Sequence, residues 1–214
     1  KKLLKKADFV LLYEIDTRLK KILSRELLEF NNYDIIWDDF LYRDVKEDLK
    51  KYNYKNIYIV ANLPYYITTP IVSKFVMETI PANEIVIMIQ KEVAERISAS
   101  HGNKTYGILS VFLQTFYDIE YLFTVGEQVF DPPPKVKSAV IRLIRNKREK
   151  LDCDEKLFFN IVKSGFNQRR KTLRNSLKSI ISPDFASETL SLRPEQLSVE
   201  DFITLCKEIQ QANK

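Results

Sequence analysis

The sequence predicts an α/β protein in which a parallel sheet is followed by a small helical region. Apolar runs of strand length alternate with segments whose apolar residues recur at helical spacing, which is typical of strands joined by helical crossovers. After Arg145 the strand-like runs stop, and the remaining segments have helical patterns. We therefore predict a sheet domain over residues 1–146 and a helical domain over residues 147–214.

Each predicted strand is a short apolar run that ends in polar or turn-forming residues. The first four are DFVLLYEID (8–16), YDIIWDDF (33–40), NIYIVANLPYY (56–66) and EIVIMIQ (84–90). DIEYLFTV (118–125) predicts another strand, and the proline corner VFDPPPKVKSAVIRLIR (129–145) leads into a sixth.

The predicted helices fill the segments between and after these strands. They are TRLKKILSRELLEF (17–30), TTPIVSKFVMETI (68–80), KEVAERI (91–97), GILSVFLQTFY (107–117), EKLFFNIVKSGF (155–166), QRRKTLRNSLKSII (168–181) and SVEDFITLCKEIQ (198–210). We expect Thr69 to cap the second of them, with Pro70 in its first turn, and Ser198 to cap the last.

Polar side chains follow three successive strands. Glu14 and Asp16 follow the first, Asp39 the second and Asn62 the third. Ligands bind at the carboxyl ends of the strands in parallel α/β sheets, so these residues predict a site at that edge. Glu14 is suited to accept hydrogen bonds from ribose hydroxyls, and Asp39 from the exocyclic amine of a purine. The pattern therefore indicates a cofactor that contains a nucleoside.

The stretch Asn62-Leu63-Pro64-Tyr65 predicts a second function at the end of the third strand. The exocyclic amine of adenine is a poor nucleophile because its lone pair is delocalised into the ring. Oxygen acceptors directed at its two N–H bonds favour a more pyramidal nitrogen, and an Asn side chain and a backbone carbonyl can supply them. Tyr65 offers a face on which a flipped-out base can stack. An ordinary strand-to-helix turn is the alternative interpretation of this tetrapeptide.

Composition narrows the classes of function. The net charge of +5 and the pI near 9.0 favour an anionic partner such as nucleic acid. The only histidine, His101, and the distant Cys153 and Cys206 give no pattern for a metal site or a Ser-His-Asp triad, so we expect no metal. The four glycines form no GxGxxG or P-loop cluster, and no apolar run has the length of a membrane span.

A basic block lies in the helical region. Between Lys163 and Ile181 the sequence has six basic residues and no acid. If the segment is one helix, Arg170, Arg174 and Lys178 share a face, because they are spaced by four residues. Like charges on one face repel, and contacts with phosphates explain the pattern better than a solvated surface does.

The motifs resemble those of the rRNA adenine N6-dimethyltransferases, and specifically the bacterial small-subunit branch. The similar segments are YEID, WDDF, NLPYYITTPIV, IMIQKEVAERI, KTYGILSVFLQ, VFDPPPKVKSAVIRL and FNQRRKTLRNSL, in the order expected for the family. The resemblance implies a Rossmann-like S-adenosylmethionine-dependent methyltransferase sheet with an antiparallel hairpin and a small helical C-terminal domain. It also implies dimethylation of two adjacent adenines in the 3′-terminal hairpin loop of small-subunit rRNA.

The resemblance assigns roles to particular residues. Asn62 accepts from the target amine, Leu63 contributes its backbone, Pro64 sets the geometry, and Tyr65 stacks on the base, with Phe130 closing the other face. Residues assigned to S-adenosyl-L-methionine are Glu14, Ile15, Asp39, Phe40 and Asn62, and those assigned to RNA are Lys135, Lys137, Arg169, Arg170, Lys171, Arg174 and Lys178. The partners implied are small-subunit rRNA and the assembling small ribosomal subunit, and we expect a cytoplasmic monomer.

One departure from the family concerns the cofactor. The family's glycine-rich loop lies a short helix before FVLLYEID, and the sequence begins at Lys1, inside that helix. We therefore expect this fragment to bind S-adenosylmethionine weakly or not at all. Three alternatives stay open: a large-subunit rRNA target, a DNA adenine target, and a non-catalytic RNA-binding assembly factor of the same fold. The proline corner and the C-terminal block argue against the first two.

Overall fold

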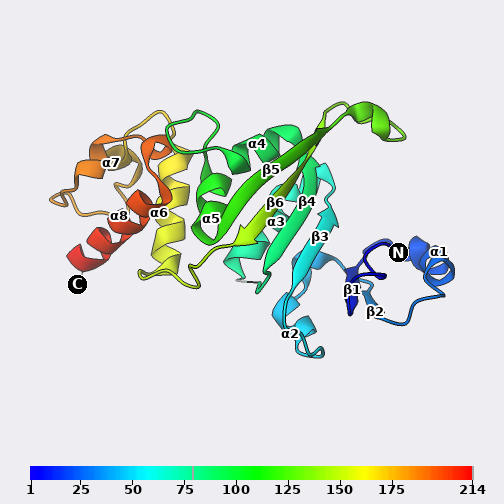
Figure 1. Cartoon of the computed structure of the whole chain (residues 1–214). Coiled ribbons are helices and arrows are strands. Elements are labelled where there is room, and N and C mark those ends of the chain that lie inside the picture. The colour runs from blue at the N-terminus through cyan, green and yellow to red at the C-terminus, as the bar shows by residue number, and fades with distance from the viewer. Residues whose placement is uncertain (79, 214) are drawn as a thin grey trace. The chain divides into compact units, whose positions relative to one another are not determined.

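The structure is a computed structural model that describes residues 1–78 and 80–213. The chain divides into two compact units, residues 1–53 and residues 54–214. Each unit contains its own sheet (Figure 1). The predicted helical domain at 147–214, of which Lys214 lies outside the described residues, falls within the second unit. Its role as a separate functional domain stays a prediction.

The first unit is built on two short parallel strands, β1 (Val10–Tyr13) and β2 (Tyr33–Ile36). A parallel pair needs a crossover, which here consists of η1 (Thr17–Leu19) and α1 (Lys20–Glu26). The segments η2 (Phe40–Tyr42) and α2 (Val45–Leu49) follow β2. Tyr13 is paired with Ile36, and the N–H of Glu14 donates to the Ile36 carbonyl at 3.0 Å. Both strands therefore end at the same edge.

The second unit contains a four-stranded sheet in the order β3-β4-β6-β5. The strands are β3 (Tyr58–Asn62), β4 (Glu84–Gln90), β5 (Tyr117–Val125) and β6 (Ser138–Arg145). β3 and β4 are parallel, whereas β6 is antiparallel to both β4 and β5. All six predicted strands are confirmed. The parallel sheet predicted from the strand pattern is wrong for β5 and β6, whereas the antiparallel hairpin that the resemblance implied is confirmed. No helical crossover lies between these two strands, so the chain returns through the proline corner as an antiparallel hairpin.

The core of the second unit is centred on β4. Ile85, Ile87 and Ile89 occupy alternate positions of this strand and are fully buried. Three helices accompany the sheet: α3 (Thr68–Met77), α4 (Lys91–Ser98) and α5 (Ile108–Phe116). Helix α3 packs against α5, and α4 packs against β5 and β6. The polar edges of the strands are thus held on a rigid apolar scaffold.

Helices dominate the chain after β6. They are α6 (Glu155–Asn167), α7 (Leu173–Ser176), η5 (Glu188–Ser191), η6 (Pro194–Gln196) and α8 (Val199–Ala212), coloured yellow to red in Figure 1. Ser198 caps α8 as predicted, because its Oγ accepts from the Asp201 N–H at 3.2 Å while the Asp201 carboxylate accepts from the Ser198 N–H at 2.8 Å. Helix α8 packs on both α6 and α5.

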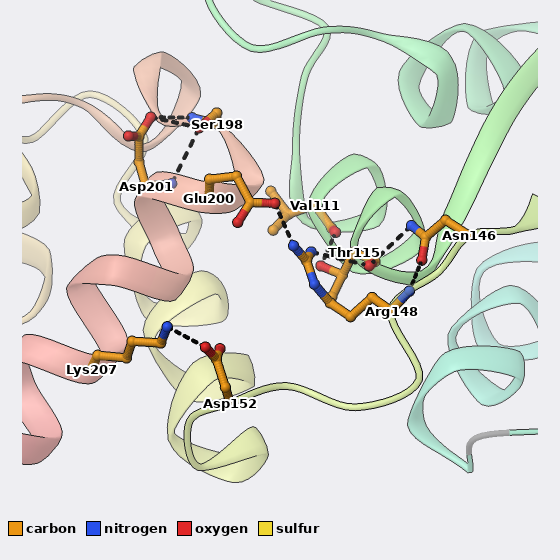
Figure 2. A network of polar contacts seen from close by, with 9 residues as sticks. All are labelled: Val111, Thr115, Asn146, Arg148, Asp152, Ser198, Glu200, Asp201 and Lys207. Atoms are coloured by element: carbon orange, nitrogen blue, oxygen red, sulfur yellow. Dashed lines mark hydrogen bonds and ion pairs between the residues drawn. The ribbon is translucent and has the colours of Figure 1, made fainter.

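The charged connector between β6 and α6 is fixed by polar contacts (Figure 2). Arg148 donates to the Thr115 carbonyl at 3.3 Å and forms an ion pair with Glu200 near the start of α8. Asn146 donates to the same Thr115 carbonyl at 3.3 Å and accepts from the Arg148 N–H at 2.9 Å. Lys207 of α8 pairs with Asp152, the residue before Cys153. These contacts attach α8 to the end of α5 through the connector.

Two local predictions are wrong. Helix α3 begins at Thr68, and the residue before it, Ile67, makes no side-chain cap, so Thr69 is not the cap. Instead the Thr68 hydroxyl donates to the Pro64 carbonyl at 3.1 Å. The predicted helix also included Thr79, which lies outside the described residues.

The second wrong prediction is that the basic residues of the block at 163–181 lie on one face of a single helix. Helix α6 ends at Asn167, and α7 spans only Leu173–Ser176. Arg170 and Lys178 therefore lie outside helices, and the block is divided by a turn in which the Lys171 N–H donates to the Gln168 carbonyl at 2.8 Å. Periodic basic residues alone do not hold a helix together, because like charges destabilise it.

Candidate active site

The NLPY motif follows the last residue of β3. Asn62 is paired with Met88, and the N–H of Leu63 donates to the Met88 carbonyl at 3.1 Å, which extends the pairing by one residue. Leu63 is buried, and Asn62 is exposed. Within the described residues, neither the Asn62 side-chain amide nor the Leu63 carbonyl forms a hydrogen bond to another protein group. Two consecutive residues thus each supply an oxygen acceptor without a protein partner among the described residues.

A tight turn after Leu63 connects the motif to α3. Pro64 has φ of −58°, and its carbonyl accepts from the Ile67 N–H at 3.2 Å and from the Thr68 hydroxyl at 3.1 Å. The short turn η3 (Tyr65–Ile67) follows. Because the proline ring restricts φ and its carbonyl has two donors, the backbone of the motif is rigid.

Tyr65 is anchored by a residue that sequence reasoning missed. Its hydroxyl and the Ser138 Oγ share a hydrogen bond at 2.6 Å. Ser138 is fully buried, is the first residue of β6, and is paired with Gln90, the last residue of β4. The Tyr65 ring is half-buried, so its position is set by the contact across the end of β4. Nothing in the local pattern of the sequence indicates a contact between residues 73 positions apart.

The proline corner lies at the same edge of the sheet. The Lys137 carbonyl accepts from the Lys91 N–H at 2.9 Å, which joins the corner to the start of α4. Lys135 and Lys137 are exposed, and their contact with RNA stays a prediction. Phe130 is half-buried and directly follows η4 (Glu127–Val129). Its predicted role as the second face around the target base stays a prediction.

Acidic residues gather where β1 and β2 of the first unit end. Glu14 accepts from the Asp16 N–H at 2.8 Å through one oxygen, and Asp39 accepts from the Leu41 N–H at 2.9 Å through one oxygen. Each carboxylate keeps its second oxygen for a hydroxyl or an amine. Ile15 is 64% exposed between the acids, and Phe40 packs edge-on against Tyr13 with ring centroids 5.0 Å apart. These residues fit a ribose and a base as acceptors and apolar contacts.

Asp16 has a different environment from Glu14 and Asp39. Arg18 donates to both of its oxygens, and these hydrogen bonds lower the pKa of Asp16 to about 2. Asp16 also caps η1 by accepting from the Arg18 N–H at 3.0 Å. Asp16 therefore shapes the turn, and the ribose contact of Glu14 stays a prediction.

A buried carboxylate holds the two acidic loops together. Asp48 is 2% exposed, forms an ion pair with Arg43, and accepts from the Tyr13 hydroxyl at 3.2 Å. Tyr13 directly precedes Glu14, and Arg43 also pairs with Asp38, directly before Asp39, at 3.3 Å. The Arg43 guanidinium lowers the pKa of Asp48, whereas burial and Asp48 together raise the pKa of Tyr13. Sequence reasoning missed this network because Asp48 lies within a short charged helix that resembles a solvated surface.

The basic residues of the helical region are in different environments. Arg169 donates to the carbonyls of Lys104 and Tyr106, and Arg174 donates to the Phe185 carbonyl at 3.2 Å. Arg170, Lys171 and Lys178 are exposed and have no salt-bridge partner among the described residues. The predicted RNA contacts therefore divide into residues that fix loops and residues that face solvent.

No described helix has the length and apolar character that crossing a membrane requires. No three His, Cys, Asp or Glu side chains in residues 1–78 and 80–213 cluster so as to hold a metal ion.

The fold of this chain is similar to that of a solved structure. The solved structure of a dimethyladenosine transferase from Plasmodium falciparum has the same fold, with a TM-score of 0.83 at 23% identity, covering 99% of this chain and 86% of that one. The Rossmann-like methyltransferase fold is thereby confirmed.

Sequence relatives are closer. The "Ribosomal RNA small subunit methyltransferase A" of Cytophaga hutchinsonii is 56% identical over 176 residues, covering 80% of this chain and 66% of the relative. That of Bacteroides thetaiotaomicron is 48% identical over 217 residues, covering 99% of this chain and 79% of the relative. This chain thus spans about two thirds to four fifths of the length of these relatives. The sequence also matches the family described as "Ribosomal RNA adenine dimethylase" over residues 1–211. The chain therefore belongs to the ribosomal RNA adenine dimethylase family.

Proposed function

We propose that this protein transfers methyl groups from S-adenosyl-L-methionine to N6 of two adjacent adenines in the 3′-terminal hairpin loop of small-subunit rRNA, and that each adenine is dimethylated. The observation that carries the proposal is the turn at the end of β3, where the Asn62 amide and the Leu63 carbonyl are available acceptors beside the anchored ring of Tyr65. The relatives named for small-subunit rRNA support the choice of target.

The chemistry required of the protein is positioning. The Asn62 Oδ1 and the Leu63 carbonyl accept hydrogen bonds from the N–H groups of the target amine, of which there are two before the first transfer and one before the second. These bonds make the lone pair of the nitrogen available. Tyr65 stacks on the flipped-out adenine, and Phe130 covers the opposite face. No dedicated general base is required, because the methylated nitrogen is cationic and loses its proton to water. Orientation and exclusion of water account for the acceleration.

The strand-end acids of the first unit are proposed to hold the cofactor. Glu14 accepts from the ribose hydroxyls, Asp39 accepts from the exocyclic amine of the adenine, and Ile15 and Phe40 contact the apolar faces. When bound, S-adenosyl-L-methionine supplies an electrophilic sulfonium methyl group. The free second oxygens of Glu14 and Asp39 support this assignment.

The exposed basic residues are proposed to contact rRNA. Lys135 and Lys137 on the proline corner, with Arg170, Lys171 and Lys178 in the helical region, are suited to phosphates, which fix orientation and do not read sequence. The partner is then the assembling small ribosomal subunit, the protein acts as a monomer, and the compartment is the cytoplasm.

The test uses the product of the complete gene, labelled S-adenosyl-L-methionine and unmethylated small ribosomal subunits. After digestion of the RNA we expect N6,N6-dimethyladenosine confined to the 3′-terminal hairpin. Asn62→Ala should abolish transfer and leave RNA binding nearly intact. Asn56→Ala is the matched control, because it removes an exposed amide just before the opposite end of β3.

Three results would change the assignment. Label in large-subunit rRNA or in DNA would move the target to that nucleic acid. Binding of subunits without any label in RNA would favour the non-catalytic assembly factor. Equal loss of binding and transfer in Asn62→Ala would refute the proposed role of Asn62.

A further inference from the structure

The side chain of Arg169 is directed toward a loop far from it in the sequence. Arg169 lies in the turn after α6, yet its guanidinium donates to the carbonyl of Lys104 and to the carbonyl of Tyr106, the latter at 3.1 Å across 63 residues of sequence. A guanidinium that donates to two backbone carbonyls has a fixed orientation. The charge of Arg169 is therefore held against the loop that precedes α5.

That loop, residues 100–106, is fixed at further points. The N–H of Gly102 donates to the Glu195 carbonyl at 2.7 Å, and Gly102 has φ of +80°, a conformation that favours glycine. Tyr106 is 1% exposed and packs edge-on against Phe166 of α6, with ring centroids 6.1 Å apart. Lys104 lies between these points and is exposed. The loop thus presents Lys104 from an ordered backbone.

The residues next to Arg169 have the opposite character. Arg170 and Lys171 are exposed, and among the described residues neither forms a side-chain hydrogen bond or an ion pair; the same holds for the amine of Lys104. The Lys104 backbone lies within the reach of one arginine side chain from Arg169. The Arg169 contact therefore joins the backbones of two distant segments, which carry three exposed cations without a charged partner among the described residues. Unpaired like charges repel, so their gathering favours an anionic partner.

We propose that Arg169 is a positioning residue, which holds Lys104 beside Arg170 and Lys171 so that these three cations form one contact for the RNA backbone. The proposal rests on the proposed function, because it requires an RNA substrate. It adds Lys104 to the RNA surface and assigns Arg169 to the loop contact and not to a phosphate. An acidic protein is the alternative partner of the same surface, and the salt dependence of RNA binding decides between them.

The first experiment measures binding of an unmodified transcript of the 3′-terminal domain of small-subunit rRNA at several salt concentrations. Each phosphate contact contributes about 0.7–0.9 to the slope of log K against log salt, so Lys104→Gln should lower that slope by this amount. Lys55→Gln is the matched control, an exposed lysine near the start of β3 that should leave the slope unchanged. An unchanged slope for Lys104→Gln would overturn the proposal, whatever Arg169 does.

The second experiment is a double-mutant cycle. Arg169→Gln should weaken binding by misplacing Lys104, so adding Lys104→Gln should change little further. By contrast, Arg170→Gln and Lys104→Gln should be additive, because they remove separate contacts. Additive effects of the Arg169 and Lys104 substitutions would mean that Arg169 contacts phosphate by itself, which refutes its positioning role.

Amide hydrogen exchange gives a readout without RNA. Arg169→Gln should accelerate exchange in residues 102–106, whereas Arg170→Gln, an identical change of charge one position later, should not. Equal exchange in the two variants would overturn the loop contact. Failure of the proposed function can be told apart from failure of this inference. RNA binding without methyl transfer would reject the proposed enzyme activity, and the tests above would still decide the inference. Absence of RNA binding by the unaltered protein would reject both.

Discussion

The hydrogen bond between Tyr65 and Ser138 predicts a measurable coupling between the NLPY turn and the proline corner. Tyr65→Phe removes the phenol oxygen and keeps the ring. It leaves the hydroxyl of Ser138, which is fully buried, without its partner at 2.6 Å. An unsatisfied buried hydroxyl costs about 1–3 kcal/mol, and we expect Tyr65→Phe to lower the free energy of unfolding by about 1–2 kcal/mol.

The reverse substitution is expected to cost less. Ser138→Ala leaves the Tyr65 hydroxyl, and since this side chain is half-buried, water partly replaces the lost partner. We expect a loss of about 1 kcal/mol for Ser138→Ala, and little further loss in the double variant, because removing both partners leaves no unsatisfied group. The coupling should therefore be about 1–2 kcal/mol in urea unfolding of the four proteins. Strict additivity would refute the reasoning.

Two substitutions of Tyr65 separate the anchoring role of its hydroxyl from the stacking role of its ring. Because Tyr65→Phe retains the ring, methyl transfer should fall by less than about tenfold, whereas Tyr65→Ala loses base stacking worth about 1–3 kcal/mol. That loss corresponds to a fall of about 5- to 150-fold in kcat/KM. Equal activity of the Phe and Ala variants would show that the Tyr65 ring does not contact the target base.

Further predictions concern the first unit and the packing of the helices. Asp48→Asn should destabilise residues 1–53 by about 1–3 kcal/mol in urea unfolding, because Tyr13 and Arg43 lose a charged acceptor. Arg43 lowers the pKa of Asp48, so the stabilisation from the Asp48 carboxylate is present above its ordinary pKa of about 4 and is lost as the pH falls through the folded-state pKa. The unfolding free energy of Asp48→Asn should therefore be less sensitive to acid below a pH of about 4 than that of the unaltered protein. Gly165→Ala should lower the free energy of unfolding by about 1 kcal/mol or less, measured by thermal unfolding. The added Cβ would lie 3.1 Å from the flexible Leu173 Cδ2, which is unfavourable, whereas alanine favours the helix more than glycine does. A stable Asp48→Asn protein with an unaltered acid profile, or a gain of several degrees in Tm for Gly165→Ala, would contradict the respective argument.

The strands and most helices, and their order along the chain, could be predicted from the sequence. The alternating or helical spacing of apolar residues shows which face of each segment is buried. The strand-end residues Glu14, Asp39 and Asn62 could likewise be predicted, since each lies within two residues of the end of an apolar run. The cap of α8 was predictable for the same reason, because Ser198 and Asp201 interact within one turn. All these features depend on neighbours only a few residues away.

Tertiary structure alone decided which of these segments touch. Ser138 reaches Tyr65 only because β6 pairs beside β4, and Arg169 reaches Tyr106 only because α6 packs on α5. The basic block showed a helical spacing, yet the chain turns at residue 168, because Arg169 gains two carbonyl partners there and a continuous helix of like charges gains none. Local patterns specify burial, whereas partners 63 or 73 residues apart are set by sheet order and helix packing, which no short stretch of the sequence contains.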